Sequence, residues 1–482
     1  MNFPVVNIGA ILPAIVLSIF GIAIMVAEPF VSDAKKSWLG WLAIAGTGAA
    51  MLSLAPMSNQ AGQWYGNLWI VDGYSIYFHF VFILIAAITI LTSVNFLQRE
   101  GIHHAEYYAL VLFATVGMMM MAGSNELIMV FLGLEILSIA TYVLAGFRRT
   151  DLKSNESALK YFLLGSFSSA FFLYGVALIF GATGSTNLIA IADSLRTGNI
   201  QLSLVSLAAA LMLIGLCFKV AVAPFHVWTP DVYEGAPTPV TGFMSVGPKA
   251  AGFAVLMRIF MTAFPTLEDR WTSAFWIVAA LTMLLGNVIA LVQPNIKRML
   301  AYSSIAHAGY IAVAFAAGSQ LGVSAILFYT LAYSLTNLGA FAVVTILSRS
   351  EDKMVSLNDY AGLASKRPGL AAVLALFMLS LAGIPGTAGF AGKFFIFRAA
   401  VESGMIWLAV IGVVTTVVSF YYYLYVIVQM YMRDPNEEFT DARVTGPLKL
   451  ALAITIAGTL YLGILPTRIL DWTVSAAANA FR

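Results

Sequence analysis

Five ionisable side chains lie inside long apolar stretches of this 482-residue chain. Four are lysines, Lys160, Lys219, Lys249 and Lys393, and the fifth is Glu135 in the segment FLGLEILSIATYVLAG. A charged side chain at the depth of a lipid bilayer costs about 3 kcal/mol or more, so such residues usually serve ion pathways or proton relays. Lysine suits a relay because its pKa shifts readily on burial, whereas arginine stays charged. The residue types therefore predict proton movement.

Glu135 and Lys219 form the most promising pair among these residues. A nearby carboxylate favours the charged form of a lysine, and desolvation favours its neutral form. A movement of the carboxylate by a few ångströms would then switch Lys219 between holding and releasing a proton. The alternative is that Glu135 is a structural carboxylate, satisfied by hydroxyl groups of a neighbouring helix.

The other three lysines differ in their positions. Lys249 lies well inside its span and is predicted to be the central relay residue. Lys393 lies near a helix break and could pass protons outward. Lys160 follows a charged loop that ends at Glu156, so it either joins the relay or extends its ammonium group to the membrane interface.

Two histidines are further candidates for the relay. His226 lies in PFHVW and His307 in SSIAHAGY. An intramembrane histidine carries protons about as often as it bonds two helices together. His79, His103 and His104 are predicted to lie near interfaces and outside the relay.

Structural roles are predicted for several other polar residues. Asp231 and Glu234, in TPDVYEGAP, are expected to cap a helix or fix a loop. Arg258 is expected to anchor the end of its span at the interface. The tyrosines 421–423 are expected to serve packing and the interface.

Composition defines the elements that must hold these residues. The chain is 60% hydrophobic and only 10% charged, with a mean hydropathy of +0.89, which indicates an all-α integral membrane protein. Apolar runs long enough to cross a bilayer recur throughout and predict about fourteen transmembrane helices. These spans are expected to begin near Ile8, Leu39, Tyr77, Ala105, Leu127, Ala158, Leu202, Val240, Phe275, Met299, Gly322, Leu370, Met405 and Leu448.

Several kinds of site are disfavoured by the sequence. Its one cysteine, Cys217, cannot form a C-x-x-C pair, which argues against an iron–sulfur cluster or structural zinc held by this chain alone. The glycine-rich nucleotide motifs are also missing. The N-terminal segment lacks the basic region and cleavage pattern of a signal peptide, so it is predicted to be a retained first span.

Lysine and arginine are distributed unequally between the two sets of loops. Loops after odd-numbered spans carry about three times as many as loops after even-numbered spans, which places the odd loops in the cytoplasm. Both termini are then predicted on the periplasmic side. The odd loops hold Lys35, Lys36, Arg99, Arg148, Arg149, Lys153, Lys297, Arg298, Arg349, Lys353, Lys366, Arg367, Arg433, Arg443 and Lys449, and the even loops with the C-terminal segment hold Arg196, Arg270, Arg398, Arg468 and Arg482.

Two spans are predicted to be interrupted. Residues 213–253 contain four closely spaced prolines after Lys219, and residues 381–397 contain Pro385 and four glycines before Lys393. Interrupted helices at membrane depth line cavities or pack in protein, and a matched pair indicates an inverted-repeat transporter.

Four regions of the chain follow from this pattern. They are residues 1–104 with spans 1–3, residues 105–264 with a first five-helix repeat (spans 4–8), residues 275–430 with a second repeat (spans 9–13), and residues 431–482 with a loop and span 14.

Several motifs carry a resemblance to a known family. FLGLEILSIATYVL, SALKYFLLG, FKVAVAPFHVWTPDVYEGAPTPVTGF, NIKRMLAYSSIAHAGY and LAGIPGTAGFAGKF resemble the antiporter-like subunits of respiratory complex I, and the PFHVWTPDVYEGAPTPV text is most similar to the N-type subunit. The resemblance implies that Glu135, Lys160, Lys219, Lys249 and Lys393 match the family's functional positions. A lysine at 393 and the short C-terminal end favour the N type over its M- and L-type sisters.

The resemblance also implies cofactors, partners and location. This chain would bind no cofactor and act as a translocase subunit, with NADH, FMN, iron–sulfur clusters and quinone in partner subunits. Its partners would be M-, K- and J-type membrane subunits and the lipid of a bacterial inner membrane, with no role for nucleic acid. Two alternatives remain open, an Mrp-type cation/proton antiporter subunit and a membrane scaffold that does not pump.

Overall fold

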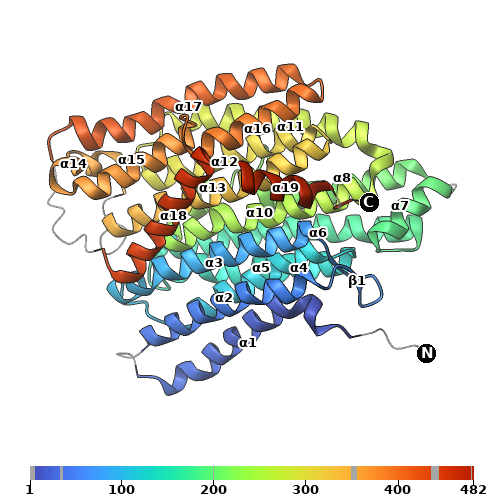
Figure 1. Cartoon of the computed structure of the whole chain (residues 1–482), viewed down its shortest axis with the longest axis horizontal. Coiled ribbons are helices and arrows are strands. Elements are labelled where there is room, and N and C mark those ends of the chain that lie inside the picture. Colours follow the sequence, from blue (N-terminus) through green and yellow to red (C-terminus); the bar gives the residue numbers. More distant parts are fainter. Residues whose placement is uncertain are drawn as a thin grey trace.

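A bundle of roughly parallel helices forms the fold in the computed structural model (Figure 1). The structure describes residues 6–32, 36–198, 200–348, 355–435, 444–478 and 480–481. Within them, 13 helices are long and apolar enough to cross a membrane, and Pro368–Ala382 is a shorter apolar helix. These fourteen match the predicted spans, so the all-helical membrane fold is confirmed. Five basic residues used for the orientation, Lys35, Arg349, Lys353, Arg443 and Arg482, lie outside the described residues.

The first three spans form a group at one side of the bundle, blue in Figure 1. A short β-hairpin, which the sequence did not reveal, joins the second span to the third. The elements are η1 (Ile8–Ile11), α1 (Leu12–Ala27), η2 (Glu28–Phe30), α2 (Ser37–Ser58), β1 (Gly62–Trp64), β2 (Trp69–Val71) and α3 (Gly73–Arg99).

The next region carries the first interrupted span. Its elements are α4 (Glu106–Gly123), α5 (Leu127–Ala145), α6 (Leu152–Thr183), the short α7 (Leu188–Thr197), α8 (Leu202–Val220), α9 (Thr229–Gly235) and α10 (Thr238–Ala263). The span that begins at α8 breaks at Ala221, which adopts a left-handed conformation with φ of 57°. Pro224 lies in the break and has no N–H donor, and the helix resumes only as the seven-residue α9. Pro230 is in the first turn of α9, where no helical N–H donor is needed.

The second interrupted span lies in the following region. Its elements are η4 (Pro265–Leu267), α11 (Glu268–Ala290), α12 (Ile296–Ala316), α13 (Gln320–Leu347), η6 (Leu357–Tyr360), α14 (Leu363–Lys366), α15 (Pro368–Ala382), α16 (Ala388–Glu402) and α17 (Ile406–Met432). Helix α15 ends where Gly383 takes a φ of 94°, which favours glycine, and α16 begins five residues later. Both predicted breaks are therefore present, in the seventh and twelfth spans.

The chain ends with α18 (Gly446–Ile464) and the short α19 (Thr467–Ala478). Helix α18 crosses the front of the bundle in Figure 1, and α19 packs on α3 through Trp472, whose ring contacts Tyr77 and Phe80. The sequence did not predict α7 or α19, because each is too short for the span pattern.

A proline inside α10 opens that helix beside its lysine. Pro248 has no N–H to give to the carbonyl of Met244, four residues earlier. The hydroxyl of Tyr233, on α9, donates to this carbonyl at 3.0 Å. The interrupted span is thus joined to α10 at Met244, five residues before Lys249.

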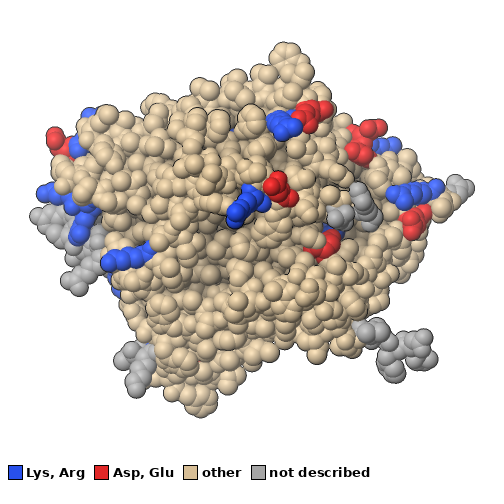
Figure 2. All heavy atoms as spheres, in the orientation of Figure 1, with Lys and Arg blue, Asp and Glu red and all other residues tan. Residues whose placement is uncertain are grey.

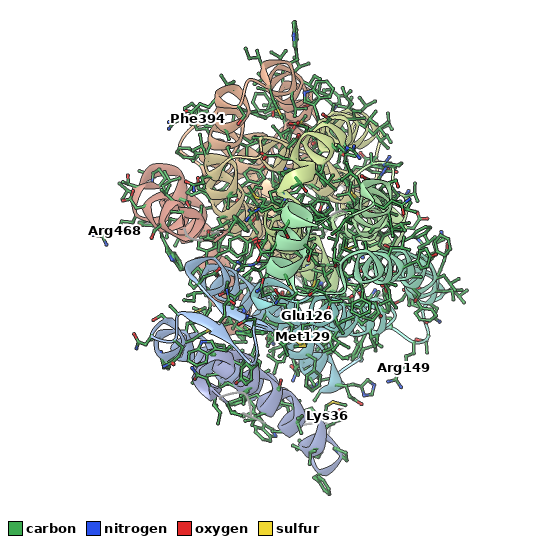
Figure 3. All side chains as sticks on the ribbon, turned by 90° about the vertical axis from the view of Figure 1, so that its right-hand side faces the viewer. Lys36, Glu126, Met129, Arg149, Phe394 and Arg468 are labelled. Atoms are coloured by element: carbon green, nitrogen blue, oxygen red, sulfur yellow. The ribbon has the colours of Figure 1, made fainter. Side chains whose placement is uncertain are left out.

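Charged side chains lie mainly toward the two ends of the helices. In Figure 2 a broad tan band separates most of the blue and red atoms at the left from those at the right. This pattern is typical of a surface that faces lipid between two aqueous sides. Seen end-on in Figure 3, Lys36 near the first spans and Phe394 on α16 lie at opposite sides of the molecule, so the chain progresses across the membrane plane.

Candidate functional site

Lys219, Lys249 and Lys393 are buried, with 4%, 3% and 3% of their surface exposed. Within the described residues, none of the three pairs directly with a carboxylate. Each ammonium group instead meets hydroxyl or carbonyl oxygens of a neighbouring helix. Buried lysines of this kind can exchange a proton with their surroundings.

Lys219 lies in the last turn of α8, where the carbonyl end of a helix favours a cation. Its Nζ donates to the Ser138 hydroxyl at 2.9 Å and lies 5.7 Å from the centre of the Tyr161 ring. Ser138 is one turn after Glu135 on α5. The Glu135 carboxylate is near enough to interact with Lys219 electrostatically, and its Oε1 has no hydrogen-bond partner in the described chain.

Lys249 is held by one residue of α12. Its Nζ donates to the Ser304 carbonyl at 2.7 Å and to the Ser304 hydroxyl at 2.6 Å. Ser304 and His307 are three residues apart on α12, so they share one face of that helix. His226, in the break after α8, also interacts electrostatically with Lys249.

His307 lies between Lys249 and Lys393 and interacts electrostatically with both. Its Nδ1 is bonded to the hydroxyl of Tyr329 on α13, and its Nε2 lies 3.0 Å from the hydroxyl of Tyr423 on α17. The ring of Tyr333 stacks on the imidazole, with 4.8 Å between the centroids. The predicted packing role of Tyr423 is therefore incomplete, because its hydroxyl belongs to this polar cluster.

Lys393 occupies the second helix break. Its Nζ donates to the carbonyls of Leu381 and Ala382, at 2.9 and 3.1 Å. These carbonyls end α15 and lack helical partners, so the ammonium group satisfies them and meets the negative end of the helix dipole. Nζ also lies 4.8 Å from the centre of the Tyr310 ring, one turn beyond His307 on α12.

Buried polar atoms without a partner among the described residues lie on the elements around the lysines. Such atoms are normally satisfied by ordered water. They include Glu135 Oε1, His226 Nδ1, Trp228 Nε1, Thr229 Oγ1, Tyr333 Oη, Asn337 Oδ1 and Thr416 Oγ1.

Lys160 lies apart from the three buried lysines. Its side chain is 40% exposed and pairs with Glu156 and Asp231, both at 2.7 Å. This position agrees with the snorkelling interpretation, and it does not bring Lys160 into the buried cluster.

Asp231 and Glu234 tie α9 to its neighbours through ion pairs, which goes beyond the predicted capping role. Asp231 also binds Arg298 at 2.8 Å, and Glu234 binds Arg298 at 2.9 Å and Lys153 at 3.3 Å. These ion pairs join α9 to α6 and α12.

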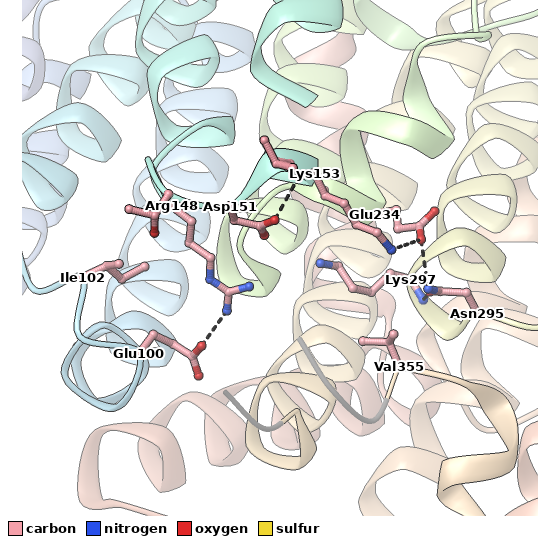
Figure 4. A pocket seen from close by; sticks show the side chains of 12 residues that line it. Glu100, Ile102, Arg148, Asp151, Lys153, Glu234, Asn295, Lys297 and Val355 are labelled. Atoms are coloured by element: carbon pink, nitrogen blue, oxygen red, sulfur yellow. Dashed lines mark hydrogen bonds and ion pairs between the residues drawn. The ribbon is translucent and has the colours of Figure 1, made fainter. Parts of the chain in front are cut away.

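A polar cavity of about 670 Å³ lies beside this group (Figure 4). Both signs of charge line it, including the pairs Arg148–Glu100 and Lys153–Glu234. Lys297 reaches its wall and donates to the Ala236 carbonyl at 2.8 Å. The cavity lies at the α9 end of the first interrupted span.

Two residues predicted to lie near interfaces are buried in the protein. Arg258 is 1% exposed, and both of its terminal nitrogens donate to Asp72, at 2.7 and 3.1 Å. His79 is buried on α3, and its Nε2 lies 3.1 Å from the Met119 carbonyl. The hydropathy pattern of the spans does not reveal these tertiary contacts.

One group in the described chain has the residue types of a metal site. Ligand atoms of Glu28, His104 and Glu106 lie within 4.8 Å of one another, although none of these residues was predicted to bind metal. Glu28 already pairs with Lys36 at 3.3 Å. We assign no metal to this group.

Known proteins are similar to this chain in both sequence and fold. Residues 124–419, which contain Glu135, His307 and all four lysines, match the family model described as NADH:quinone oxidoreductase/Mrp antiporter, TM. The chain belongs to this family. The motif-based assignment is thus confirmed.

Curated relatives of this family member align over nearly the whole chain. A protein of Trichlorobacter lovleyi named NADH-quinone oxidoreductase subunit N is 48% identical, covering 98% of each chain. A protein of Koribacter versatilis named NADH-quinone oxidoreductase subunit N 2 is 49% identical, covering 99% of this chain and 98% of its own.

Solved structures extend the likeness to the fold. A chain of Thermus thermophilus respiratory complex I with bound aureothin has a TM-score of 0.81 at 38% identity, covering 95% of this chain and 98% of that one. A chain of the Mrp complex from Dietzia has a TM-score of 0.84 at 22% identity, covering 99% and 98%. The latter likeness concerns the fold alone.

Proposed function

We propose that this chain is the N-type membrane subunit of a respiratory NADH:quinone oxidoreductase and that it moves protons through its buried lysines. The supporting observation is that Lys249 and Lys393 contact α12 on either side of His307, Lys249 at Ser304 and Lys393 at the Tyr310 ring. In this mechanism the Glu135 carboxylate controls whether Lys219 holds its proton. The proton then passes between Lys219, Lys249 and Lys393, with His226 and His307 as intermediate positions.

Water completes the proposed path. The distances between the lysines exceed one hydrogen bond, so a side-chain relay needs bridging hydroxyls or water. Unpartnered buried atoms such as His226 Nδ1 and Tyr333 Oη offer positions where water can bind. Lys160 is a peripheral member at most, since its ammonium group is exposed and already paired.

The energy would come from partner subunits. The family assignment supports electron transfer from NADH to quinone through FMN and iron–sulfur clusters in other subunits of the complex. M-, K- and J-type membrane subunits would be the neighbours of this chain.

This chain would lie in a bacterial inner membrane with both termini in the periplasm. Residues 105–264 and 275–430 would form its two inverted repeats.

The test replaces single lysines in the assembled complex. We expect Lys219→Ala and Lys249→Ala to lower NADH-driven proton uptake by inverted vesicles. The part of this uptake that passes through this chain should fall by at least about tenfold, because a proton-transfer group is lost. Lys366→Ala, at an exposed lysine, is the matched control. Normal proton uptake per NADH oxidised, in a normally assembled complex that carries Lys249→Ala, would sink the relay proposal.

The same vesicles separate the two alternatives. A stand-alone antiporter would exchange Na⁺ for protons without NADH. A scaffold would lose assembly in the lysine variants while the remaining assembled complex pumped normally.

A further inference from the structure

Three tyrosines surround His307 in the interval between Lys249 and Lys393. Tyr329 and Tyr333 come from α13 and Tyr423 from α17, and all three are buried. We propose that Tyr423 and Tyr329 are themselves proton carriers, which pass the proton to and from the two nitrogens of His307. This inference rests on the proposed relay and names residues that the lysine motifs do not include.

The hydrogen bonds form a continuous line through the imidazole. The Ser303 hydroxyl is bonded to the Tyr423 hydroxyl, which is bonded to His307 Nε2, and His307 Nδ1 is bonded to the Tyr329 hydroxyl. No water molecule is needed at any of these three contacts. Three helices, α12, α13 and α17, each contribute to the line.

The two hydrogen bonds at Tyr423 give its hydroxyl the geometry that a proton relay needs. A phenol hydroxyl has one proton to donate, and Tyr423 has two hydrogen-bond partners. It must therefore accept from one partner while it donates to the other. A hydroxyl that donates and accepts at once is arranged to take up one proton as it releases another.

The proposed step conserves protons at each atom. A proton arrives at the Tyr423 oxygen from the Ser303 side, and the proton that Tyr423 held moves to Nε2 of His307. The imidazolium so formed releases its Nδ1 proton to the Tyr329 oxygen, and Tyr329 gives its own proton to a water molecule on the Lys393 side. Each hydroxyl ends neutral, and the ring ends in its other tautomer. The reverse sequence carries a proton in the opposite direction.

The two ends of the line point toward the two lysines without bonding them directly. Ser303 precedes Ser304, which bonds Lys249, but neighbouring residues of a helix do not face each other. At the other end, ring carbons of Tyr329 lie against Gly392, and Lys393 is the next residue. Water must therefore carry the proton between each lysine and its end of the line.

Tyr423→Phe in the assembled complex tests the proposal, since it removes one hydroxyl and keeps the ring. We expect proton uptake per NADH oxidised, measured in the assembled complex, to fall by at least about twofold. Tyr329→Phe tests the other side of the imidazole and is expected to act in the same direction. Tyr421→Phe is the matched control, because Tyr421 is on the same helix with 63% of its surface exposed.

The outcomes distinguish this inference from the proposed function. If Lys249→Ala stops pumping while Tyr423→Phe and Tyr329→Phe pump like Tyr421→Phe, the tyrosine relay is wrong and the lysine relay stands. If Lys249→Ala also pumps normally, the proposed function fails. If Tyr423→Phe lowers only the yield or the thermal midpoint, with normal uptake per NADH in the assembled fraction, Tyr423 is structural and the inference is overturned.

Discussion

Arg258 is a buried cation whose guanidinium binds both carboxylate oxygens of Asp72. The pair joins α10 to the start of α3, where Asp72 also caps the helix by accepting from the Ser75 N–H. Arg258 donates to the Ala480 carbonyl as well, at 2.8 Å. One residue therefore holds three segments that are far apart in the sequence.

Removal of either partner is expected to be costly. Arg258→Met leaves the Asp72 carboxylate without its counter-charge, and breaking a buried ion pair in this way costs about 3–5 kcal/mol. The thermal unfolding midpoint of the purified complex is expected to fall accordingly. Lys153→Met is the control, because its pair with Glu234 is exposed and such pairs contribute about 0–1 kcal/mol. Equal midpoints for the two variants would contradict the role assigned to Arg258.

At the scale of helices, the irregular elements hold the chemistry. Lys219 lies in the last turn of α8, Lys249 follows a proline inside α10, and the Lys393 ammonium group reaches the carbonyl end of α15. The break after α15 leaves the carbonyls of Leu381 and Ala382 free to accept from Lys393. Lys219 and Lys249 instead bond serines of the neighbouring helices α5 and α12.

The contact between Pro248 and Tyr233 can be tested by a double-mutant cycle. Tyr233→Phe leaves the Met244 carbonyl without a donor, which should cost about 1–3 kcal/mol. Pro248→Ala restores the backbone donor to Met244, so Tyr233→Phe is expected to cost much less in that background. Thermal midpoints of the four forms give the coupling free energy. Additive effects would show that Tyr233 does not compensate for the proline.

At the scale of the whole molecule, the predicted orientation can be checked by labelling. Cys217 is buried, so a background with Cys217→Ser allows single cysteines to be placed in loops. Asn59→Cys, in an exposed loop after the second span, is expected to react with an impermeant maleimide in spheroplasts. Thr150→Cys, in an exposed loop after the fifth span, should react only in inverted vesicles. The opposite pattern would reverse the predicted topology.

Sequence alone determined the membrane class, the spans and both interruptions. Span length, proline and glycine act locally, so their consequences can be predicted without neighbours. An apolar run around a lysine did not by itself decide its burial, because Lys219, Lys249 and Lys393 are buried and Lys160 is 40% exposed.

Only the tertiary structure decided which partners these residues meet. Ser138, Ser304 and the tyrosines around His307 come from other helices, and many serines and tyrosines in the sequence look alike. The exposure of Lys160 and the burial of Arg258 likewise depend on which face of a helix is covered. Hydropathy measures how apolar a segment is, whereas the site depends on the direction in which each side chain packs.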